Sequence, residues 1–319
     1  MSTLLSQFPI ESTAGAALIG TYLAAVMYGF TILQTYQYFS RYWGKDRTYI
    51  YVLVITLTIL DTLALIFNIH MMWHFLIANY CNPITFLFAD WSTLLSILTN
   101  AVTGIIVQAF YAYRLWILSD RKYYLASILI ILLGMGALAS CTVYMAYLFK
   151  FGTFLQVVRL AAVLQYLPTM YYSFSIGADA LITFGITYLL VKNHSDGVRS
   201  FRTDNVIRKL IAYTLNAGAI TTLCCVISLI LCRALPQTYY DLLFSLPLSK
   251  LYVNSMLAFL NAREGLRKKG GSIAVNLTTS KTTSYEMDTK IRDRGNEPEN
   301  RPSSPFSPFF SSAPKSASA

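Results

Sequence analysis

The sequence contains few charged residues. Asp, Glu, Lys and Arg make up 13% of its 319 residues, whereas a soluble globular domain carries about 25%. Hydrophobic residues make up 55%, and the mean hydropathy is +0.50. This composition excludes an ordinary soluble domain and is typical of a protein embedded in a lipid bilayer.

Histidine and cysteine are scarce as well, which limits metal chemistry. His70 and His74 have the i, i+4 spacing of metal ligands on a helix, but no Glu of an HExxH motif accompanies them. A closed site would need Asp90, Cys81 or water, so the alternative is that both histidines form hydrogen bonds at the membrane interface. We therefore predict no metal site here.

The five cysteines form no CxxC motif and no zinc-type spacing. Three of them lie inside apolar stretches, where small polarizable side chains are expected to pack. The other two, Cys81 and Cys232, fall near the predicted outer face. A disulfide bond between these two is one hypothesis, and two free thiols are the other.

What the sequence has in abundance is long apolar stretches, each near the length of about 20 residues that a membrane-spanning helix needs. They cover residues 16–38, 49–75, 90–113, 123–149, 170–191, 208–232 and 240–262. A helix satisfies every backbone polar group within lipid. The sequence therefore predicts an all-α membrane protein, a seven-transmembrane helix bundle over 16–265, preceded by a short outer N-terminus over 1–15 without a signal peptide.

Basic residues punctuate these stretches and set the orientation. With the N-terminus outside, fifteen Lys and Arg residues fall in the inner loops and the proximal tail, and only Lys150, Arg159 and Arg233 fall outside. Positive charge favours the cytoplasmic side, so we predict the N-terminus out and the C-terminus in, most simply at the plasma membrane. Because this charge of +10 marks topology, it does not predict nucleic-acid binding.

The composition changes after about residue 265. Residues 266–319 are rich in Ser, Thr and Pro, which predicts a disordered cytoplasmic tail. Arg267, Lys268 and Lys269 begin it, and each basic residue near an anionic inner leaflet contributes about 1 kcal/mol of attraction. This cluster either binds anionic lipids or serves only as a topology anchor.

Three charges interrupt the apolar stretches: Asp61, Asp179 and Lys250. A charge at mid-bilayer costs roughly 2.5–3.5 kcal/mol, so such residues are functional-site candidates. Lys250 and Asn254 share a helix face, and Pro247 predicts a kink just before them. We predict an ion pair between Lys250 and one of the two carboxylates, which is either a functional site or only a structural link.

The third stretch carries a polar stripe at helical spacing. Its members are Thr93, Ser96, Asn100, Thr103 and Tyr111. Such a stripe faces protein or water, so it indicates hydrogen bonds between helices or the wall of a ligand or water cavity. With Lys250, Asp61, Asp179 and Asn254, Asn100 forms the predicted intramembrane polar site.

A lysine midway along the last span also raises the question of retinal. Retinal pumps resemble this chain only in outline, because they place an Asp one turn before the lysine, where this sequence has Leu246. Their third helix has mid-membrane carboxylates, whereas here Asp90 lies at the edge of the span. We expect neither retinal nor another cofactor.

Several short motifs together resemble a known family. They are YG at 28–29, LQTYQYF at 33–39, KDR at 45–47, LDT at 60–62, His70, NYCNP at 79–83, KLYVNS at 250–255 and LNAR at 260–263. The combination is similar to basidiomycete fungal membrane proteins known only by a domain of unknown function. The resemblance covers about residues 15–265 and implies a seven-helix fungal membrane protein, without a ligand, activity or catalytic residues.

The leading functional hypothesis is a receptor-like or sensory membrane protein, which would bind a small ligand and a cytosolic partner. It rests on the seven spans, the basic loop at 192–209 and the Ser/Thr-rich tail. The alternative is a transporter or channel for a small solute or ion that uses the intramembrane Asp and Lys residues. We do not expect an enzyme, because the sequence offers no nucleophile–base pair and no complete set of metal ligands.

Overall fold

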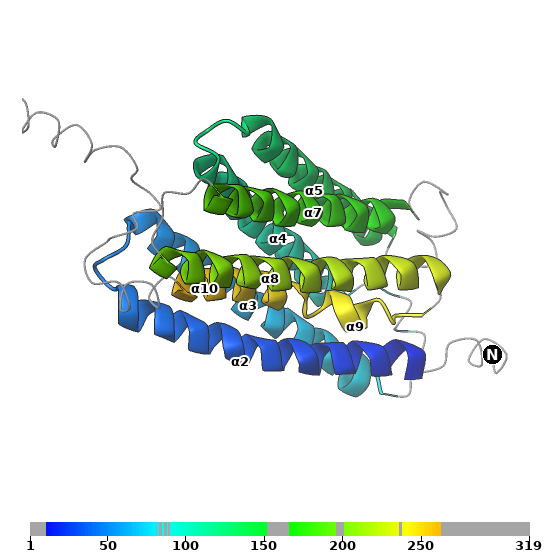
Figure 1. Ribbon diagram of the computed structural model, residues 1–319. Helices are drawn as coiled ribbons and strands as arrows, with labels where there is room; N and C mark the ends of the chain where they lie inside the picture. Colours follow the sequence, from blue (N-terminus) through cyan, green and yellow to red (C-terminus); the bar gives the residue numbers. More distant parts are fainter. Residues whose placement is uncertain are drawn as a thin grey trace, which may run out of the picture. The chain divides into compact units, whose positions relative to one another are not determined.

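A computed structural model describes residues 11–80, 82, 85, 88, 90–151, 166–195, 201–235 and 238–262, without the side chains of 11, 12, 190, 193–195 and 201–217. These residues are all-helical and include no β-strand (Figure 1). The long helices are α2 (Ala16–Tyr42), α3 (Thr48–Trp73), α4 (Trp91–Leu118), α5 (Tyr124–Phe151), α7 (Tyr166–Ser195), α8 (Phe201–Ala234) and α10 (Leu248–Ala262). Shorter elements are η1 (Glu11–Gly15), η2 (His74–Ala78) and α9 (Leu242–Ser245).

Five of the helical segments in this part of the chain are long and apolar enough to cross a membrane. They are Thr13–Tyr42, Thr48–Ala78, Trp91–Leu118, Tyr124–Phe151 and Leu242–Ala262. The remaining predicted spans, 170–191 and 208–232, lie in α7 and α8. The structure describes the side chains of α7 and α8 only in part, and the described stretch Gly218–Ala234 of α8 is apolar. These five segments support the predicted class, an all-α membrane protein, whereas the count of seven spans stays a prediction.

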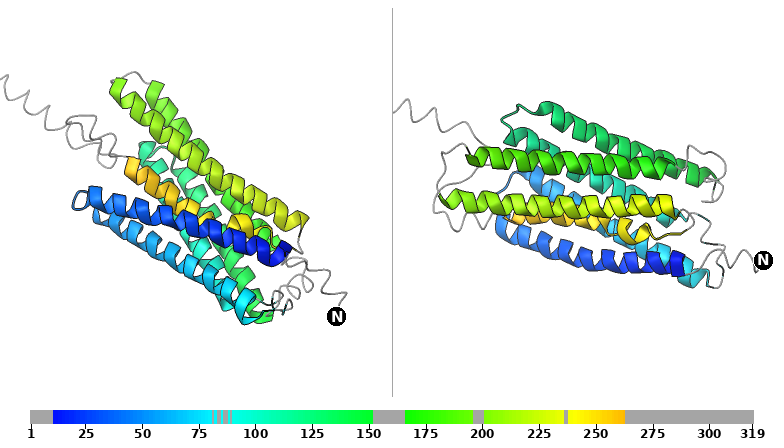
Figure 2. Two further views of the ribbon diagram at one scale, coloured as in Figure 1. Left: turned by 90° about the horizontal axis from the view of Figure 1, so that it is seen from below. Right: turned by 45° about the vertical axis from the view of Figure 1, so that its right-hand side comes forward.

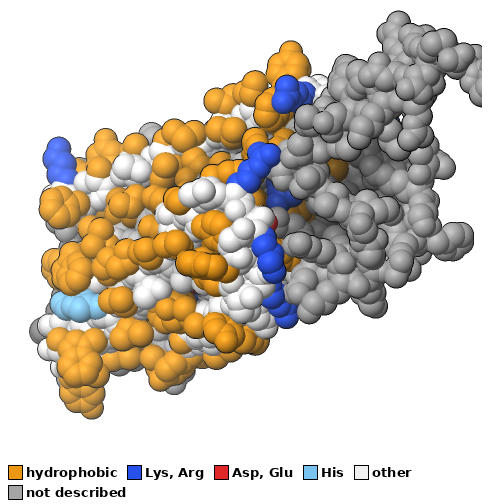
Figure 3. All heavy atoms as spheres, turned by 90° about the vertical axis from the view of Figure 1, so that its left-hand side faces the viewer, with side chains coloured by type: hydrophobic (Ala, Val, Ile, Leu, Met, Phe, Trp, Pro, Cys, Tyr) orange, Lys and Arg blue, Asp and Glu red, His pale blue; other side chains and the backbone are white. Residues whose placement is uncertain are grey.

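The bundle exposes apolar side chains and buries polar ones. Along α2, Ile19, Val26, Phe30 and Leu33 point outward, and Val26 is 60% exposed. The buried polar residues include Thr21, Thr31, Asp61, Asn68, Ser96, Thr103 and Gln108. Seen from one end of the bundle, hydrophobic side chains cover most of the described surface, and Lys and Arg lie at a few separate places (Figure 3). Exposed apolar surface of this extent is expected where lipid is the solvent.

The long helices pack in chain order, and α10 closes the ring. Each helix contacts the next one along the chain, and α10 packs against α2, α3, α4 and α8. Both views of Figure 2 show α10 lying between α2 and α8. Val253, Met256, Leu257 and Leu260 of α10 are completely buried within the main core cluster. Because α10 occupies the interior, its polar residues meet several helices.

Local sequence signals explain how some of these helices begin and end. Asp90 caps α4, because its side chain accepts a hydrogen bond from the backbone N–H of Ser92 at 3.0 Å. The turn between α4 and α5 contains Asp120 and Arg121 with positive φ, a conformation that Asp tolerates better than most residues.

The last helical segment is interrupted at Leu246–Pro247, between α9 and α10, where the sequence predicts a kink. Proline lacks a backbone N–H, and its ring clashes with the preceding helical turn. Gly20 of α2 lets α9 approach closely, because a Cβ atom there would lie 2.7 Å from the Leu242 carbonyl oxygen. The missing side chain of Gly20 therefore allows α9 to lie against the start of α2.

Candidate functional site

Asp61 and Lys250 form an ion pair in the interior of the bundle. Lys250 Nζ lies 3.3 Å from Asp61 Oδ1, and neither side chain has exposed surface. Asp61 comes from the middle of α3 and Lys250 from the first turn of α10. Of the two carboxylates that the sequence offers as partners for Lys250, the structure brings Asp61 to it.

The hydrogen-bonding groups of this pair are satisfied. An ammonium group has three donors, and Lys250 Nζ meets Asp61 Oδ1, the Asp61 backbone oxygen at 3.3 Å and Ser249 Oγ at 3.1 Å. Ser249 Oγ donates to Asp61 Oδ1 at 3.3 Å, and Thr31 Oγ1 of α2 donates to Asp61 Oδ2 at 3.0 Å. Both carboxylate oxygens therefore accept from neighbouring groups.

Asn254 extends this cluster to the backbone of α2. Its amide Nδ2 donates to the Met27 carbonyl oxygen at 2.9 Å, and its Oδ1 lies 3.2 Å from Thr31 Oγ1. We call Thr31, Asp61, Ser249, Lys250 and Asn254 the paired cluster. It cross-links α2, α3 and α10, and none of its members lines either of the cavities described below.

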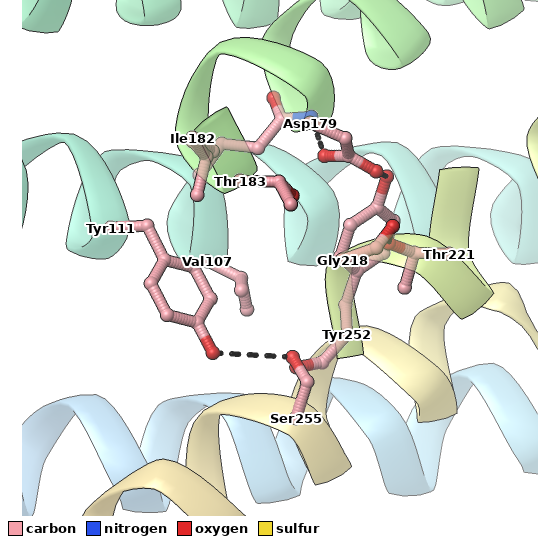
Figure 4. Close-up of a pocket in the computed structure, with 10 residues that line it drawn as sticks. Val107, Tyr111, Asp179, Ile182, Thr183, Gly218, Thr221, Tyr252 and Ser255 are labelled. Atoms are coloured by element: carbon pink, nitrogen blue, oxygen red, sulfur yellow. Dashed lines mark hydrogen bonds between the residues drawn. The ribbon is translucent and has the colours of Figure 1, made fainter. Parts of the chain in front are cut away.

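Asp179 of α7 lies in a different environment, among neutral donors. Gln108 Nε2 of α4 donates to Asp179 Oδ1 at 3.2 Å, and Tyr252 OH of α10 donates to Asp179 Oδ2 at 2.7 Å. Figure 4 shows the Asp179 carboxylate next to the Tyr252 hydroxyl. Asp179 is 3% exposed, and no Lys or Arg in the described part of the chain forms an ion pair with it.

A small cavity of about 20 Å³ adjoins this carboxylate. Its walls come from α4, α7, α8 and α10 and include Asp179 and Tyr252 (Figure 4). Tyr111 and Ser255, whose hydroxyls lie 3.4 Å apart, also line it. One water molecule needs a cavity of roughly 10–15 Å³, so this cavity has room for about one water and for no larger ligand.

A second cavity, of about 210 Å³, lies at one end of the bundle. Its lining comes from the starts of α2, α4 and α7 and from the ends of α3, α5 and α8. The segment from the α8–α9 connection to the start of α10 completes the wall. We call it the end cavity. Its wall is mostly apolar and aromatic, a composition typical of small-molecule sites.

A few polar groups lie in the wall of the end cavity. Thr93 Oγ1 and Asn100 Oδ1 are buried without a hydrogen-bond partner among the described residues, and Thr93 is 7% exposed. Asp241 is the one charged side chain among the residues described in this wall. Burial raises the pKa of the neighbouring Tyr239 phenol well above its ordinary value, and Asp241 raises it further, so this hydroxyl keeps its proton at neutral pH.

The residues of the predicted polar site therefore lie in separate places. Lys250, Asp61 and Asn254 come together in the paired cluster, Asp179 borders the small cavity, and Asn100 borders the end cavity. The polar stripe of α4 is divided in the same way. Thr93 and Asn100 line the end cavity, Ser96 donates to Asn68, Thr103 donates to its own helix, and Tyr111 meets Ser255.

The two histidines lie apart from these sites. His70 Nδ1 is 3.7 Å from Asp90 Oδ2, and His74 Nε2 is 3.3 Å from Asn79 Nδ2. Within the described ranges, no three His, Cys, Asp or Glu side chains are grouped so that they could hold a metal ion. Cys81, the hypothetical disulfide partner of Cys232, lies outside the described residues, as do Arg267, Lys268 and Lys269.

Sequence reasoning did not single out Gln108, Tyr252 and Asp241. Gln108 carried a usable signal, because a polar side chain within a membrane span hydrogen-bonds across helices. Tyr252 lies two residues from Lys250, which places it on another side of α10, so the polar pattern of the lysine face does not include it. Asp241 lies at the edge of its predicted span, where a charged residue is common and does not by itself indicate a site.

Exposed apolar helices around an interior that also buries polar and charged side chains define this protein as an all-helical, membrane-embedded protein. Residues 175–265, which include Asp179, Lys250 and Tyr252, match a sequence family described as "Family of unknown function (DUF6534)". No curated protein and no solved structure matches the chain. The fungal origin and the seven-helix character implied by the sequence resemblance stay predictions.

Proposed function

We propose that this protein is a seven-span, receptor-like or sensory membrane protein whose ligand site is the end cavity. The main observation in support of this proposal is that the cavity of about 210 Å³ is lined by residues from every long described helix, α2 to α10. A ligand bound there would contact all the helices at once. Such contacts would let binding change how the helices pack, which is what a sensory protein requires.

The orientation of the bundle supports an outward-facing site. The lining residues lie where α2, α4, α7 and α10 begin and where α3, α5 and α8 end. In an up-and-down bundle these ends share one side, and with the N-terminus out that side is extracellular. The inner side would carry the basic loops and the tail, where anionic lipids and a cytosolic partner would bind.

The size of the cavity indicates a small ligand. An engineered cavity of about 150 Å³ in another protein binds benzene, so about 210 Å³ accommodates a molecule somewhat larger than benzene. Thr93 and Asn100 offer hydrogen-bonding groups that no described residue uses.

The alternative function is transport of a small solute or ion. One observation favours it: Asp179 is a buried carboxylate without a cationic partner in the described part of the chain, and it borders a water-sized cavity. Carboxylates inside membranes often belong to ion or proton pathways. Against this alternative, the sequence shows no inverted repeat of the kind that many transporters have.

Accessibility of Cys232 tests the proposed site. Cys232 lines the end cavity, whereas the fully buried Cys225 does not. A small, membrane-impermeant cationic methanethiosulfonate reagent added to intact cells should modify Cys232 but not Cys225, as read by mass spectrometry, and Cys232→Ser should abolish that signal. Modification of Cys232 only after permeabilisation would contradict the proposed orientation and site.

Flux measurements separate the two functions. Vesicles that contain the purified protein should show no proton or solute flux above that of empty vesicles, in the wild type and in Asp179→Asn alike. A flux that the wild type supports and Asp179→Asn abolishes would refute the receptor-like function and establish transport.

A further inference from the structure

We propose, building on the ligand site of the proposed function, that the end cavity binds a small organic cation whose ammonium group pairs with Asp241. The inference rests on the charge of the cavity wall, on its aromatic residues and on its unused polar groups.

Asp241 is a carboxylate without a cationic partner in the part of the chain that the structure describes. The basic residues near it in the sequence are engaged elsewhere, because Arg233 lies over the Tyr166 ring at 4.9 Å and Lys250 pairs with Asp61. The Asp241 backbone oxygen accepts a hydrogen bond from Ser228 Oγ of α8 at 3.4 Å, which holds this segment against the bundle. The Asp241 carboxylate is thus held at the cavity wall, where a bound cation would stabilise its ionised form and an anion would not.

Aromatic rings line the same cavity. They belong to Phe75, Tyr144, Tyr171, Tyr172 and Tyr239, and the rings of Tyr171 and Tyr172 meet edge to face with centroids 5.2 Å apart. The face of an aromatic ring attracts an organic cation, and quaternary ammonium ligands are commonly held in aromatic cages. A carboxylate together with tyrosine rings provides both interactions that an ammonium group requires.

The rest of the wall suits the remainder of such a ligand. Met71, Met72 and Leu246 offer apolar surface to a hydrocarbon body. Thr93 Oγ1 and Asn100 Oδ1 are free to bond a hydroxyl or an N–H group. The best match is therefore a compact molecule with one positive charge, a short apolar body and at most a few polar atoms.

Choline and its uncharged isostere 3,3-dimethylbutan-1-ol form a matched pair of probes, because they differ mainly in the positive charge. The full-length protein is reconstituted in phosphatidylglycerol nanodiscs, and binding is measured by calorimetry and by protection of Cys232 from thiol modification. We expect choline to bind at least tenfold more tightly than the alcohol. Asp241→Asn should weaken choline binding at least tenfold, and Asp241→Glu, which keeps the charge, should weaken it less than threefold.

Asp120→Asn is the matched control, since this exposed residue in the α4–α5 turn is far in sequence from the cavity residues and has a positive φ that Asn accepts. It should leave choline binding unchanged. Equal binding of choline and the alcohol, or unchanged choline binding in Asp241→Asn, would overturn the organic-cation inference and leave the proposed ligand site standing. Cys232 that the reagent cannot reach from outside would overturn the proposed site as well.

The ammonium group could come from a free solute or from a lipid headgroup, and the bilayer composition distinguishes them. Phosphatidylcholine carries the same trimethylammonium group as choline, whereas phosphatidylglycerol carries none. Choline affinity that is equal in nanodiscs of both lipids assigns the site to a free solute. Affinity that falls in phosphatidylcholine assigns it to a headgroup, and both results support recognition of an ammonium group.

Discussion

Asp61 and Asp179 are both buried carboxylates within one helical bundle, but their surroundings differ. Asp61 has Lys250 Nζ at 3.3 Å and hydroxyl donors from Thr31 and Ser249. Among the described residues, Asp179 has only neutral donors, Gln108, Thr221 and Tyr252, and a water-sized cavity lies beside it. The first arrangement is balanced in charge and closed, whereas the second leaves one negative charge without a described counter-ion.

This difference shows that a charge within an apolar segment does not by itself mark a functional site. Lenient insertion scales assign similar costs to Asp and Lys at mid-bilayer, yet the partner decides what the charge does. A buried pair mainly holds helices together, and removing one partner is costly because the other charge is left alone. An unpaired carboxylate near a cavity can exchange its interactions more readily.

The largest expected effect comes from breaking the ion pair. Lys250→Met leaves Asp61 without its cation in a site that has no exposed surface. We expect the free energy of unfolding to fall by about 3–5 kcal/mol, the range for one-sided removal of a buried pair. Equilibrium unfolding in mixed micelles containing SDS measures this change.

Two control variants sharpen that measurement. Lys122→Met replaces an exposed lysine and should change the free energy of unfolding by at most about 0.5 kcal/mol. The double variant Asp61→Asn/Lys250→Met removes both charges and should recover most of the loss, since a neutral replacement of a buried pair is often tolerated. A double variant as unstable as Lys250→Met would mean that the loss does not come from leaving the Asp61 carboxylate unpaired.

An intermediate effect is expected at Asp179 when one of its donors is removed. Tyr252→Phe deletes the hydroxyl that lies 2.7 Å from Asp179 Oδ2, and a hydrogen bond to a charged group contributes about 1.5–3 kcal/mol. Tyr111→Phe is the matched control on the same cavity, because it removes a contact of 3.4 Å between two neutral hydroxyls. That change should cost nearer 0.6 kcal/mol, the average for such bonds in membranes. Equal losses in the two variants would show that Asp179 is uncharged in the folded protein.

The helical segments were predictable because lipid thickness fixes their length and the apolar stretches have that length. The ends of the helices were harder to predict. The predicted third span stops at 113, whereas α4 continues to Leu118. Residues 114–118 include Arg114, whose guanidinium lies 4.9 Å from the centre of the Phe259 ring. This contact joins α4 to α10, and no window along a single segment contains that information.

The candidate sites were predictable only in part. The cost of an isolated charge in lipid predicts that Lys250 needs a carboxylate, but the choice between Asp61 and Asp179 depends on helix depth and rotation. The end cavity is harder still, since its wall combines residues from Ala17 to Leu248. Within its own segment, each of them is an ordinary apolar, aromatic or polar residue that does not indicate a cavity. The wall forms where the ends of the long described helices meet.

The smallest effect is expected from the change that tests the comparison most directly, Asp179→Asn. Asparagine has the shape of aspartate and keeps one oxygen acceptor, and the Tyr252 hydroxyl can turn to accept a hydrogen bond from the new amide. Loss of the charge-assisted bonds is offset because no charge remains to be buried, so the free energy of unfolding should change by at most about 1 kcal/mol. Asp61→Asn is the matched variant in the same assay, and it should cost about 3–5 kcal/mol because Lys250 is then a buried cation without its partner. If Asp179→Asn proved as destabilising as Asp61→Asn, Asp179 would have to be held in its charged form by a cation, and the two carboxylates would be equivalent after all.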